Sequence, residues 1–212
     1  MVWRLFQFTL AIAIGLLLFG IYTLYSSQSV LTKVPAEYTF GPETADLKVV
    51  AFLDYSCTHC RESYAPMMEA IEKDGNVQFA PLLVTTPNST DEYAMRLTYA
   101  AALVGKYKEF FQDIMGNYRT IDERGVTDLA LKYGMDPEKL IQTLDNKLVD
   151  QLAAKSMVVF KKLNGQYTPT FFVGPHIKYV PTETPTTEDF LRVFQEARGE
   201  KASEPVTTEE KK

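Results

Sequence analysis

The chain has 212 residues, and its 22 Lys and Arg against 27 Asp and Glu give a net charge of −5 at pH 7. This length fits one ordinary domain with appendages, and a composition that is 46% hydrophobic and 23% charged is that of a globular protein. The mildly acidic balance includes no basic patch, so we expect no nucleic-acid partner.

An uncharged run from Leu5 to Tyr25 follows Arg4 near the start of the chain. A run of about 20 apolar residues can cross the hydrocarbon core of a bilayer. The positive-inside rule then predicts a signal anchor, residues 1–25, with the N-terminus in the cytoplasm and the rest outside. Small residues at Ser27–Ser29 leave a cleaved signal peptide open as the alternative, which would make the protein secreted or periplasmic. Both interpretations export the domain to an oxidising compartment.

Residues 26–46 are predicted to form a tether, in which Tyr38–Phe40 makes a possible short strand. The next segment, Leu47–Leu53, is nearly continuous in apolar residues. Such a run is typical of a central strand that is buried on both faces.

A helix is predicted from Cys57 to about Asp74, followed by a second strand at Val77–Val84. Residues 47–84 would thus form a βαβ unit, the first half of a sheet domain. Pro66 lies inside the predicted helix, where it lacks a backbone donor and predicts a kink. Helical spacing gives this helix an apolar face made of Tyr64, Met67, Met68 and Ile71.

Residues 85–164 are predicted to form an all-helical insertion between the two halves of the sheet domain. The longest of its helices carries one apolar stripe at helical period. The starts of the others are marked by capping residues, including Ser89 with Glu92 and Asp136 with Pro137. The predicted helices run from Ser89 to about Val104, Lys106 to Met115, Asp122 to Tyr133, from Asp136 onward, and Asn146 to Leu163.

Residues 165–198 are predicted to complete the sheet domain. Phe171–Val173 and Ile177–Val180 form a hairpin, and Thr186 caps a final helix. A βαβ unit makes parallel strands and a hairpin makes antiparallel ones, so the sheet should be mixed. The polar residues 199–212 are predicted to be disordered.

The two cysteines of the chain, Cys57 and Cys60, stand at Cys-x-x-Cys spacing at the start of the first predicted helix. Unpaired backbone N–H groups and the helix dipole stabilise a thiolate at that position. The thiolate is the reactive form of cysteine. The pattern therefore favours a redox-active dithiol/disulfide, with no metal and no cofactor besides the pair itself.

The sequence offers less support for other uses of the cysteine pair. A zinc site needs about four ligands, and the chain adds only His59 and His176, far apart in sequence. Covalent haem attachment needs a His directly after Cys60, where Arg61 stands. An inert disulfide would close a very short loop and constrain the unfolded chain little.

From about Leu47 to Ala197 the chain resembles the DsbA-like branch of the thioredoxin superfamily. The resemblance rests on the run Cys57–Cys60, on the helical insertion, and on Thr168-Pro169 entering a strand. It implies an α/β thioredoxin fold with a mixed central sheet and an inserted all-helical domain. It also implies that Pro169 is a cis-proline whose loop packs against the cysteines and whose backbone pairs with the substrate chain.

The resemblance further implies a role for each residue of the motif. Cys57 would be the exposed nucleophile and Cys60 the buried resolving thiol, with His59 stabilising the Cys57 thiolate and making the disulfide oxidising. Thr58 stands where the family commonly has Pro, and Thr168 where it commonly has Val. A threonine before the cis-proline resembles the pattern of the disulfide isomerases. Both departures affect the expected redox potential and the choice of partner.

Asp54 is a second candidate at the site, because an acid near the disulfide can relay protons. In thioredoxins the relay acid lies six residues before the first cysteine. In this chain that position is occupied by Ala51. Asp54 lies only three residues before Cys57, so a turn-forming Asp is an equal alternative. His176 is expected to be a surface residue. Aromatic side chains in the insertion are expected to form core rather than substrate groove: Tyr93, Tyr99, Phe110 and Phe111.

The predicted function is a membrane-anchored extracytoplasmic thiol:disulfide oxidoreductase that introduces disulfides into exported proteins. Expected partners are unfolded exported proteins, the bilayer through the N-terminal helix, and a membrane redox partner of the DsbB type or a DsbD-type reductant. Isomerases of the DsbC type carry an extra N-terminal dimerisation domain, for which residues 26–46 are too short, so an oxidase is favoured. Isomerase, reductase, copper-binding chaperone and inert scaffold remain the alternatives.

Overall fold

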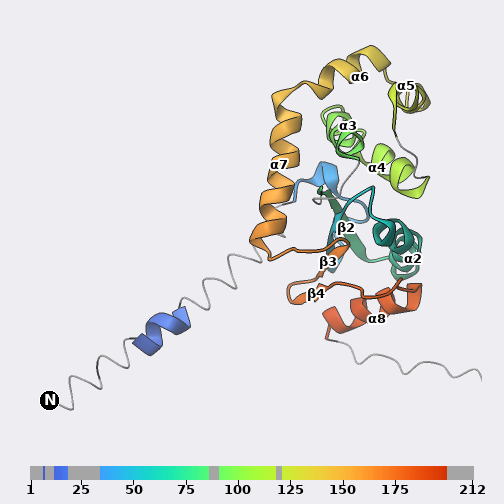
Figure 1. Cartoon of the computed structure of the whole chain (residues 1–212). Helices are drawn as coiled ribbons and strands as arrows, with labels where there is room; N and C mark the ends of the chain where they lie inside the picture. Colours follow the sequence, from blue (N-terminus) through green and yellow to red (C-terminus); the bar gives the residue numbers. More distant parts are fainter. Residues whose placement is uncertain (1–6, 8–11, 19–33, 86–90, 118–120, 200–212) are drawn as a thin grey trace, which may run out of the picture. The chain divides into compact units, whose positions relative to one another are not determined.

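The structure is a computed structural model that describes residues 7, 12–18, 34–85, 91–117 and 121–199 (Figure 1). The chain divides into two compact units, Met1–Val34 and Pro35–Lys212.

In the first unit, residues 12–18 are helical and carry exposed apolar side chains such as Leu16, which is 67% exposed. Most of the predicted anchor, Leu5–Tyr25, and all of Ser27–Ser29 lie outside the described residues. Among the residues that are described, no helix has both the length and the apolar character needed to cross a membrane.

A four-stranded sheet forms the centre of the second unit, in the order β2-β1-β3-β4. β1 (Leu47–Leu53) pairs in parallel with β2 (Val77–Leu83) and antiparallel with β3 (Thr170–Val173). β4 (Ile177–Tyr179) closes the antiparallel hairpin with β3. The prediction of a mixed sheet is thereby confirmed, and β1 is a central strand with a partner on each side.

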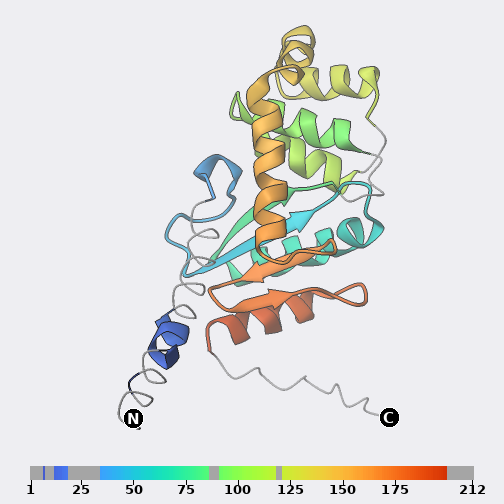
Figure 2. The ribbon, with the colours of Figure 1, turned by 60° about the vertical axis from the view of Figure 1, so that its left-hand side comes forward.

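Seven α-helices of this unit are described. α3 to α7 lie between β2 and β3 in the chain, and Figures 1 and 2 show α3 to α6 as one group from which α7 runs back to the sheet. The bounds are α2 Thr58–Asp74, α3 Glu92–Ala102, α4 Tyr107–Gly116, α5 Glu123–Lys132, α6 Pro137–Leu144, α7 Lys147–Lys162 and α8 Thr187–Ala197.

Helices cover both faces of the sheet. Phe52 of β1 packs against Phe160 of α7, with ring centroids 5.1 Å apart. Phe171 of β3 packs edge-on against Phe190 of α8, also at 5.1 Å. Phe172, which points away from Phe171, contacts Phe52. α7 and α8 therefore lie on opposite faces, which explains why β1 is an apolar run rather than an alternating one.

Side-chain caps fix where several helices begin. Asp122, Asp136 and Asn146 each accept a backbone N–H at the start of α5, α6 and α7, and Pro137 occupies the first position of α6. Thr186 and Asp189 form a complete capping box at α8. These starts were predicted because Asp, Asn and Thr satisfy N–H groups that a helix leaves unpaired.

Three local predictions were wrong. Tyr38–Phe40 is not a strand: a 3-10 helix spans Ala36–Tyr38, and Phe40 makes a single antiparallel bridge to Phe79. The Tyr38 ring packs on Tyr107 with centroids 4.7 Å apart, a contact of high sequence separation that local pattern does not reveal. α3 begins at Glu92 after Asp91, which makes no side-chain cap, and Ser89 lies outside the described residues.

The third error concerns the buried face of α2. Its buried residues are Cys60, Ser63, Met67 and Ala70, whereas Tyr64, Met68 and Ile71 are only half-buried. Small residues such as Ser63 and Ala70 let α2 lie close to its neighbours. A search for large apolar side chains at helical spacing does not identify such residues as the buried face. The helix continues through Pro66, so the kink there stays a prediction.

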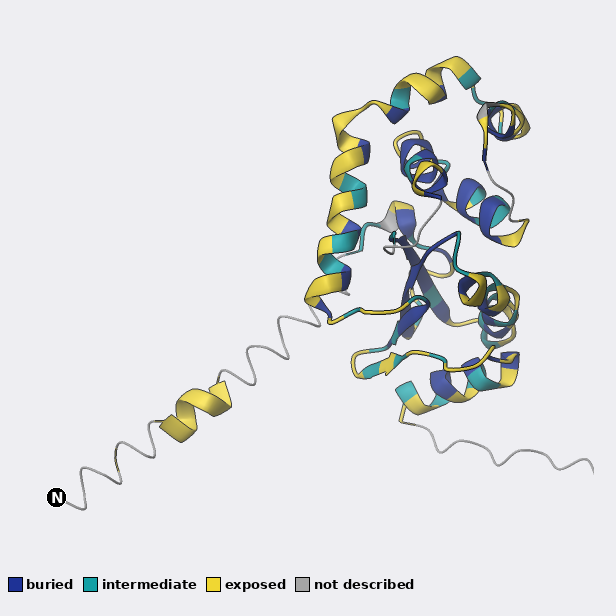
Figure 3. Ribbon diagram, viewed as in Figure 1, coloured by how far each residue is buried: buried dark blue, intermediate teal, exposed yellow. Residues whose placement is uncertain are grey.

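The core lies in the sheet and in the sides of the helices that face it, drawn dark blue in Figure 3. Tyr99, Phe110 and Phe111 belong to it, as predicted, while Tyr93 is 39% exposed. Arg198, directly after α8, binds both Asp46 before β1 and Asp74 at the end of α2. This pair of contacts ties three distant segments together.

Gly165 illustrates how tightly α7 is packed at its end. Its backbone N–H donates to the Phe160 carbonyl at 2.8 Å. A Cβ added at Gly165 would lie 2.1 Å from atoms of the Phe160 ring, which is buried and packs on Phe52. Only glycine fits this position without moving an aromatic core residue.

We expect Gly165→Ala to lower the free energy of unfolding by about 1–3 kcal/mol, because overpacking forces side chains and backbone to shift. Urea denaturation of both proteins measures this loss in the free energy of unfolding. Gln166→Ala, at the exposed neighbouring residue, is the control and should change stability by no more than about 0.5 kcal/mol. Equal stability of the two variants would contradict this packing.

Candidate active site

A short turn after β1 sets the position of Cys57. The carboxylate of Asp54 accepts hydrogen bonds from the backbone N–H of Ser56 at 3.0 Å and from its hydroxyl at 2.8 Å. The Asp54 carbonyl accepts the N–H of Cys57 at 3.1 Å. Cys57 is thereby held at the N-cap of α2, as predicted. No acidic residue occupies the first turn of α2, so the positive end of the helix dipole is not neutralised there.

The two cysteines, both free thiols here, differ sharply in exposure. Cys57 is half-buried, and its Sγ lies 3.2 Å from the carbonyl oxygen of Thr168. Cys60 is 0% exposed, and its Sγ accepts the backbone N–H of Asp54 at 3.5 Å. A partner can therefore reach the sulfur of Cys57 and not that of Cys60.

The loop before β3 completes the site from a distant part of the chain. The Thr168–Pro169 peptide bond is cis, as predicted, and Pro169 is buried. The hydroxyl of Thr170, which is itself fully buried, donates to the Tyr167 carbonyl at 2.6 Å. This bond holds the loop so that the Thr168 carbonyl faces Cys57.

The pKa values of the two thiols are driven in opposite directions. The pKa of Cys57 falls from 9.0 to about 5, first because the Cys60 side chain hydrogen-bonds to its thiolate, and further because the Thr168 hydroxyl does so as well. Burial and the Asp54 charge act against this fall. The pKa of Cys60 is raised far above its ordinary value, chiefly by burial and then by its bond to Cys57.

The structure does not bring His59 to the sulfur as the resemblance implied. Its side chain is 67% exposed, and Nδ1 lies 3.7 Å from Oε2 of Glu62, one turn further along α2. That same Glu62 oxygen accepts the hydroxyl of Thr184 at 2.9 Å. Among the described residues, no hydrogen bond joins the His59 ring to Cys57, and the thiolate is stabilised by Cys60 and Thr168 instead.

Asp54 and Thr58 occupy contrasting positions. Asp54 is 2% exposed and builds the turn, yet its backbone also contacts the Cys60 sulfur, so turn and relay roles both remain compatible with its position. Thr58 is exposed, and its hydroxyl accepts a hydrogen bond from Arg61 at 3.1 Å.

Sequence reasoning missed Arg61 and Tyr55. Arg61 also donates to the Tyr55 carbonyl at 2.7 Å, bracing the active-site turn against α2. The buried Tyr55 hydroxyl lies 2.8 Å from the Thr98 hydroxyl of α3. The only sequence signal for a role of Tyr55 at the site was its position directly after Asp54. These contacts connect the turn to the helical insertion.

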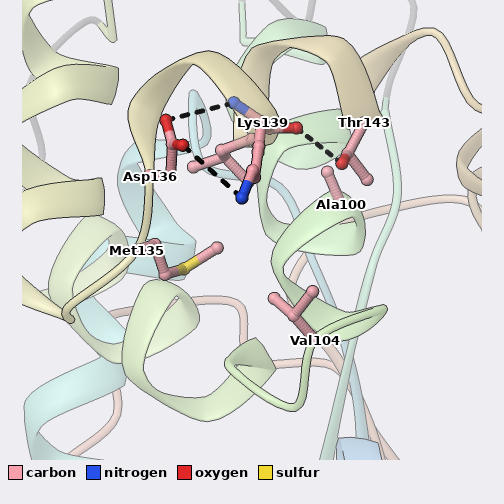
Figure 4. Close-up of a pocket in the computed structure, with 7 residues that line it drawn as sticks. Ala100, Val104, Met135, Asp136, Lys139 and Thr143 are labelled. Atoms are coloured by element: carbon pink, nitrogen blue, oxygen red, sulfur yellow. Dashed lines mark hydrogen bonds and ion pairs between the residues drawn. The ribbon is translucent and has the colours of Figure 1, made fainter.

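No group of three or more His, Cys, Asp or Glu suited to a metal ion occurs within the part of the chain that the structure describes. His176 lies between β3 and β4 and is exposed. A separate cavity of about 170 Å³ lies between α3 and α6 (Figure 4). It is lined mainly by apolar atoms, the polar groups of Asp136, Lys139 and Thr143 bond to one another, and no predicted site residue lines it.

A Cys-x-x-Cys pair at a helix start, beside a cis-proline loop on a mixed sheet, defines the dithiol centre of a thioredoxin-like thiol–disulfide oxidoreductase. The family model described as Thioredoxin matches residues 33–195, well over half of the chain. The chain therefore belongs to the thioredoxin family.

Solved structures of thioredoxin-like proteins, one of them a DsbA protein, share its fold. A thioredoxin-like oxidoreductase from Silicibacter pomeroyi DSS-3 is 28% identical with a TM-score of 0.66, over 76% of this chain and 91% of that one. The thiol-disulfide exchange protein alpha-DsbA2 from Wolbachia pipientis is 17% identical with a TM-score of 0.64, over 83% and 96%. A periplasmic thioredoxin-like protein from Salmonella enterica serovar Typhimurium is 18% identical with a TM-score of 0.59, also over 83% and 96%.

Among curated proteins, the Na(+)/H(+) antiporter NhaA of Herminiimonas arsenicoxydans is 23% identical over 133 residues. That similarity takes in 63% of this chain and 21% of the antiporter, so the chain spans about a fifth of the length of this curated relative.

The first prediction from the site concerns which group sets the acidity of Cys57. The thiolate absorbance of the reduced protein in the ultraviolet should titrate at about pH 5. Cys60→Ala should raise this pKa toward 9.0, because it removes the strongest hydrogen bond to the sulfur. His59→Ala should raise it less. A larger shift in His59→Ala than in Cys60→Ala would return the dominant role to the imidazole.

The second prediction is a pH dependence of stability. Between about pH 5 and 9 the unfolded reduced chain binds a proton at Cys57 and the folded one does not, so stability rises with pH over this window. The gain is lost as the pH falls through about 5. Urea unfolding under reducing conditions should therefore show the protein gaining stability relative to Cys57→Ser as the pH rises. A difference independent of pH would refute the thiolate assignment.

Proposed function

We propose that the protein is an extracytoplasmic thiol:disulfide oxidase that introduces disulfides into exported proteins through Cys57 and Cys60. The observation that carries the proposal is the opposite perturbation of the two thiols, an accessible acidic Cys57 beside a buried Cys60 of raised pKa. A stabilised thiolate favours the reduced pair, which makes the disulfide a strong oxidant.

In the first step of the reaction, a substrate thiolate attacks Sγ of Cys57 in the oxidised pair. The Cys57–Cys60 bond breaks, a mixed disulfide forms at Cys57, and the electron pair goes to Cys60. The raised pKa of Cys60 means that its sulfur then takes up a proton. Asp54, buried beside that sulfur, is the candidate relay for this proton.

In the second step, another thiolate of the substrate attacks the substrate sulfur of the mixed disulfide. Cys57 leaves as a thiolate, and its pKa of about 5 makes it a good leaving group at neutral pH. Two electrons have then passed from two substrate thiols to the cysteine pair. A membrane oxidant of the DsbB type would restore the disulfide.

Thr168 is the feature that keeps isomerase and reductase as alternatives. Its hydroxyl lowers the pKa of both thiols and so stabilises the reduced pair. That effect favours an oxidising disulfide, in agreement with the oxidase.

A low reduction potential of the Cys57–Cys60 pair would favour the reductase instead, and tight Cu(I) binding by the purified protein would favour a copper chaperone.

The location outside the cytoplasm is supported by the apolar run Leu5–Tyr25 after Arg4. It also agrees with the periplasmic protein of similar fold. In this proposal residues 1–25 anchor the protein in the bacterial inner membrane, and the catalytic domain acts in the periplasm or outside the cell.

The proposal is tested by oxidation of a reduced dithiol peptide. Cys57→Ala should abolish turnover, because no disulfide can form and the remaining sulfur, that of Cys60, is buried. Cys60→Ala should also lose turnover, because the pair can no longer form the disulfide that takes the two electrons. His176→Ala is the matched control and should keep full activity. Undiminished peptide oxidation by Cys57→Ala would refute the mechanism.

A further inference from the structure

Tyr167 has an exposed ring and immediately precedes Thr168, whose carbonyl contacts Cys57. Its side chain is 69% exposed, the highest value among the large hydrophobic residues that the structure describes. A tyrosine ring normally buries much of its apolar surface, so this exposure calls for an explanation other than packing within the described residues.

The backbone of Tyr167 is held in place while its ring is left open. The Tyr167 carbonyl accepts the hydroxyl of Thr170 at 2.6 Å, and Thr170 is fully buried. In the described part of the chain the Tyr167 ring takes part in none of the aromatic contacts that join the core tyrosines. A ring on a fixed backbone loses little conformational freedom when it binds a partner.

The backbone of Tyr167 lies next to the sulfur to which a substrate is joined. The next residue, Thr168, has its carbonyl oxygen 3.2 Å from Sγ of Cys57. Consecutive Cα atoms are only about 3.8 Å apart. Any polypeptide joined to Cys57 as a mixed disulfide therefore has residues flanking its own cysteine close to Tyr167.

We propose that Tyr167 determines substrate specificity by packing against an apolar or aromatic side chain that flanks the reacting cysteine of the substrate. The occupant is thus an extended segment of an incompletely folded protein, in which apolar side chains near cysteines are still exposed. The inference rests on the proposed function and adds to it a preference among substrates.

The test uses two reduced dithiol peptides that are identical except for the residue next to the reactive cysteine, Leu in one and Ser in the other. The protein should oxidise the Leu peptide faster. Tyr167→Ala should remove this preference by slowing the Leu peptide about 3- to 10-fold, the range expected for one aromatic contact. Tyr167→Phe keeps the ring and should keep the preference.

Two controls separate this inference from other effects. Leu131→Ala removes a side chain of α5 that is 64% exposed and should leave the preference unchanged. Dithiothreitol, which has no flanking side chain, reports the reactivity of the cysteine pair alone. A loss in Tyr167→Ala that is equal for dithiothreitol and for both peptides would overturn the inference, because it would mean a disturbed cysteine pair.

The remaining outcomes also decide the question. If the protein oxidises both peptides equally, or if Tyr167→Ala keeps the preference, Tyr167 has no role in specificity while the proposed function stands. If the protein oxidises neither peptide, the proposed function fails and the preference fails with it.

Discussion

The contact between Cys57 and the cis-proline loop is the interaction on which the site depends. It joins residues 57 and 168, which are separated by the whole helical insertion. β1 and β3 pair antiparallel, so the end of β1 meets the beginning of β3, and the turn after one strand faces the loop before the other. The sheet register therefore determines the distance between the nucleophile and the residue that faces it.

Burial then separates the tasks of two chemically identical side chains. Cys57 and Cys60 are one turn of α2 apart, but only Cys60 belongs to the face that packs on the core. Because charge is costly in the interior, the buried sulfur keeps its proton and can donate a hydrogen bond to the exposed one. The low pKa of Cys57 thus depends on the way in which α2 is packed as well as on the helix start, where the backbone N–H of Cys60 also lowers it.

The sequence was sufficient to predict the elements whose signals are local. The apolar run of β1, the caps at Asp136 and Thr186, and the cysteine pair at a helix start are all read within a few residues, and the resemblance added the cis-proline. Contacts between distant segments were not predictable in this way. The 3-10 helix at Ala36–Tyr38 packs on Tyr107, and His59 lies beside Glu62, which Thr184 also contacts.

The unequal exposure of the two sulfurs also bears on damage by oxidants. An exposed thiolate is the form that peroxides convert to a sulfenic acid, and in this chain that describes Cys57 alone. With the Cys60 thiol beside it, such a sulfenic acid would condense to the Cys57–Cys60 disulfide and release water. The buried partner thereby intercepts the lesion before it becomes irreversible and returns the protein to its own oxidised form.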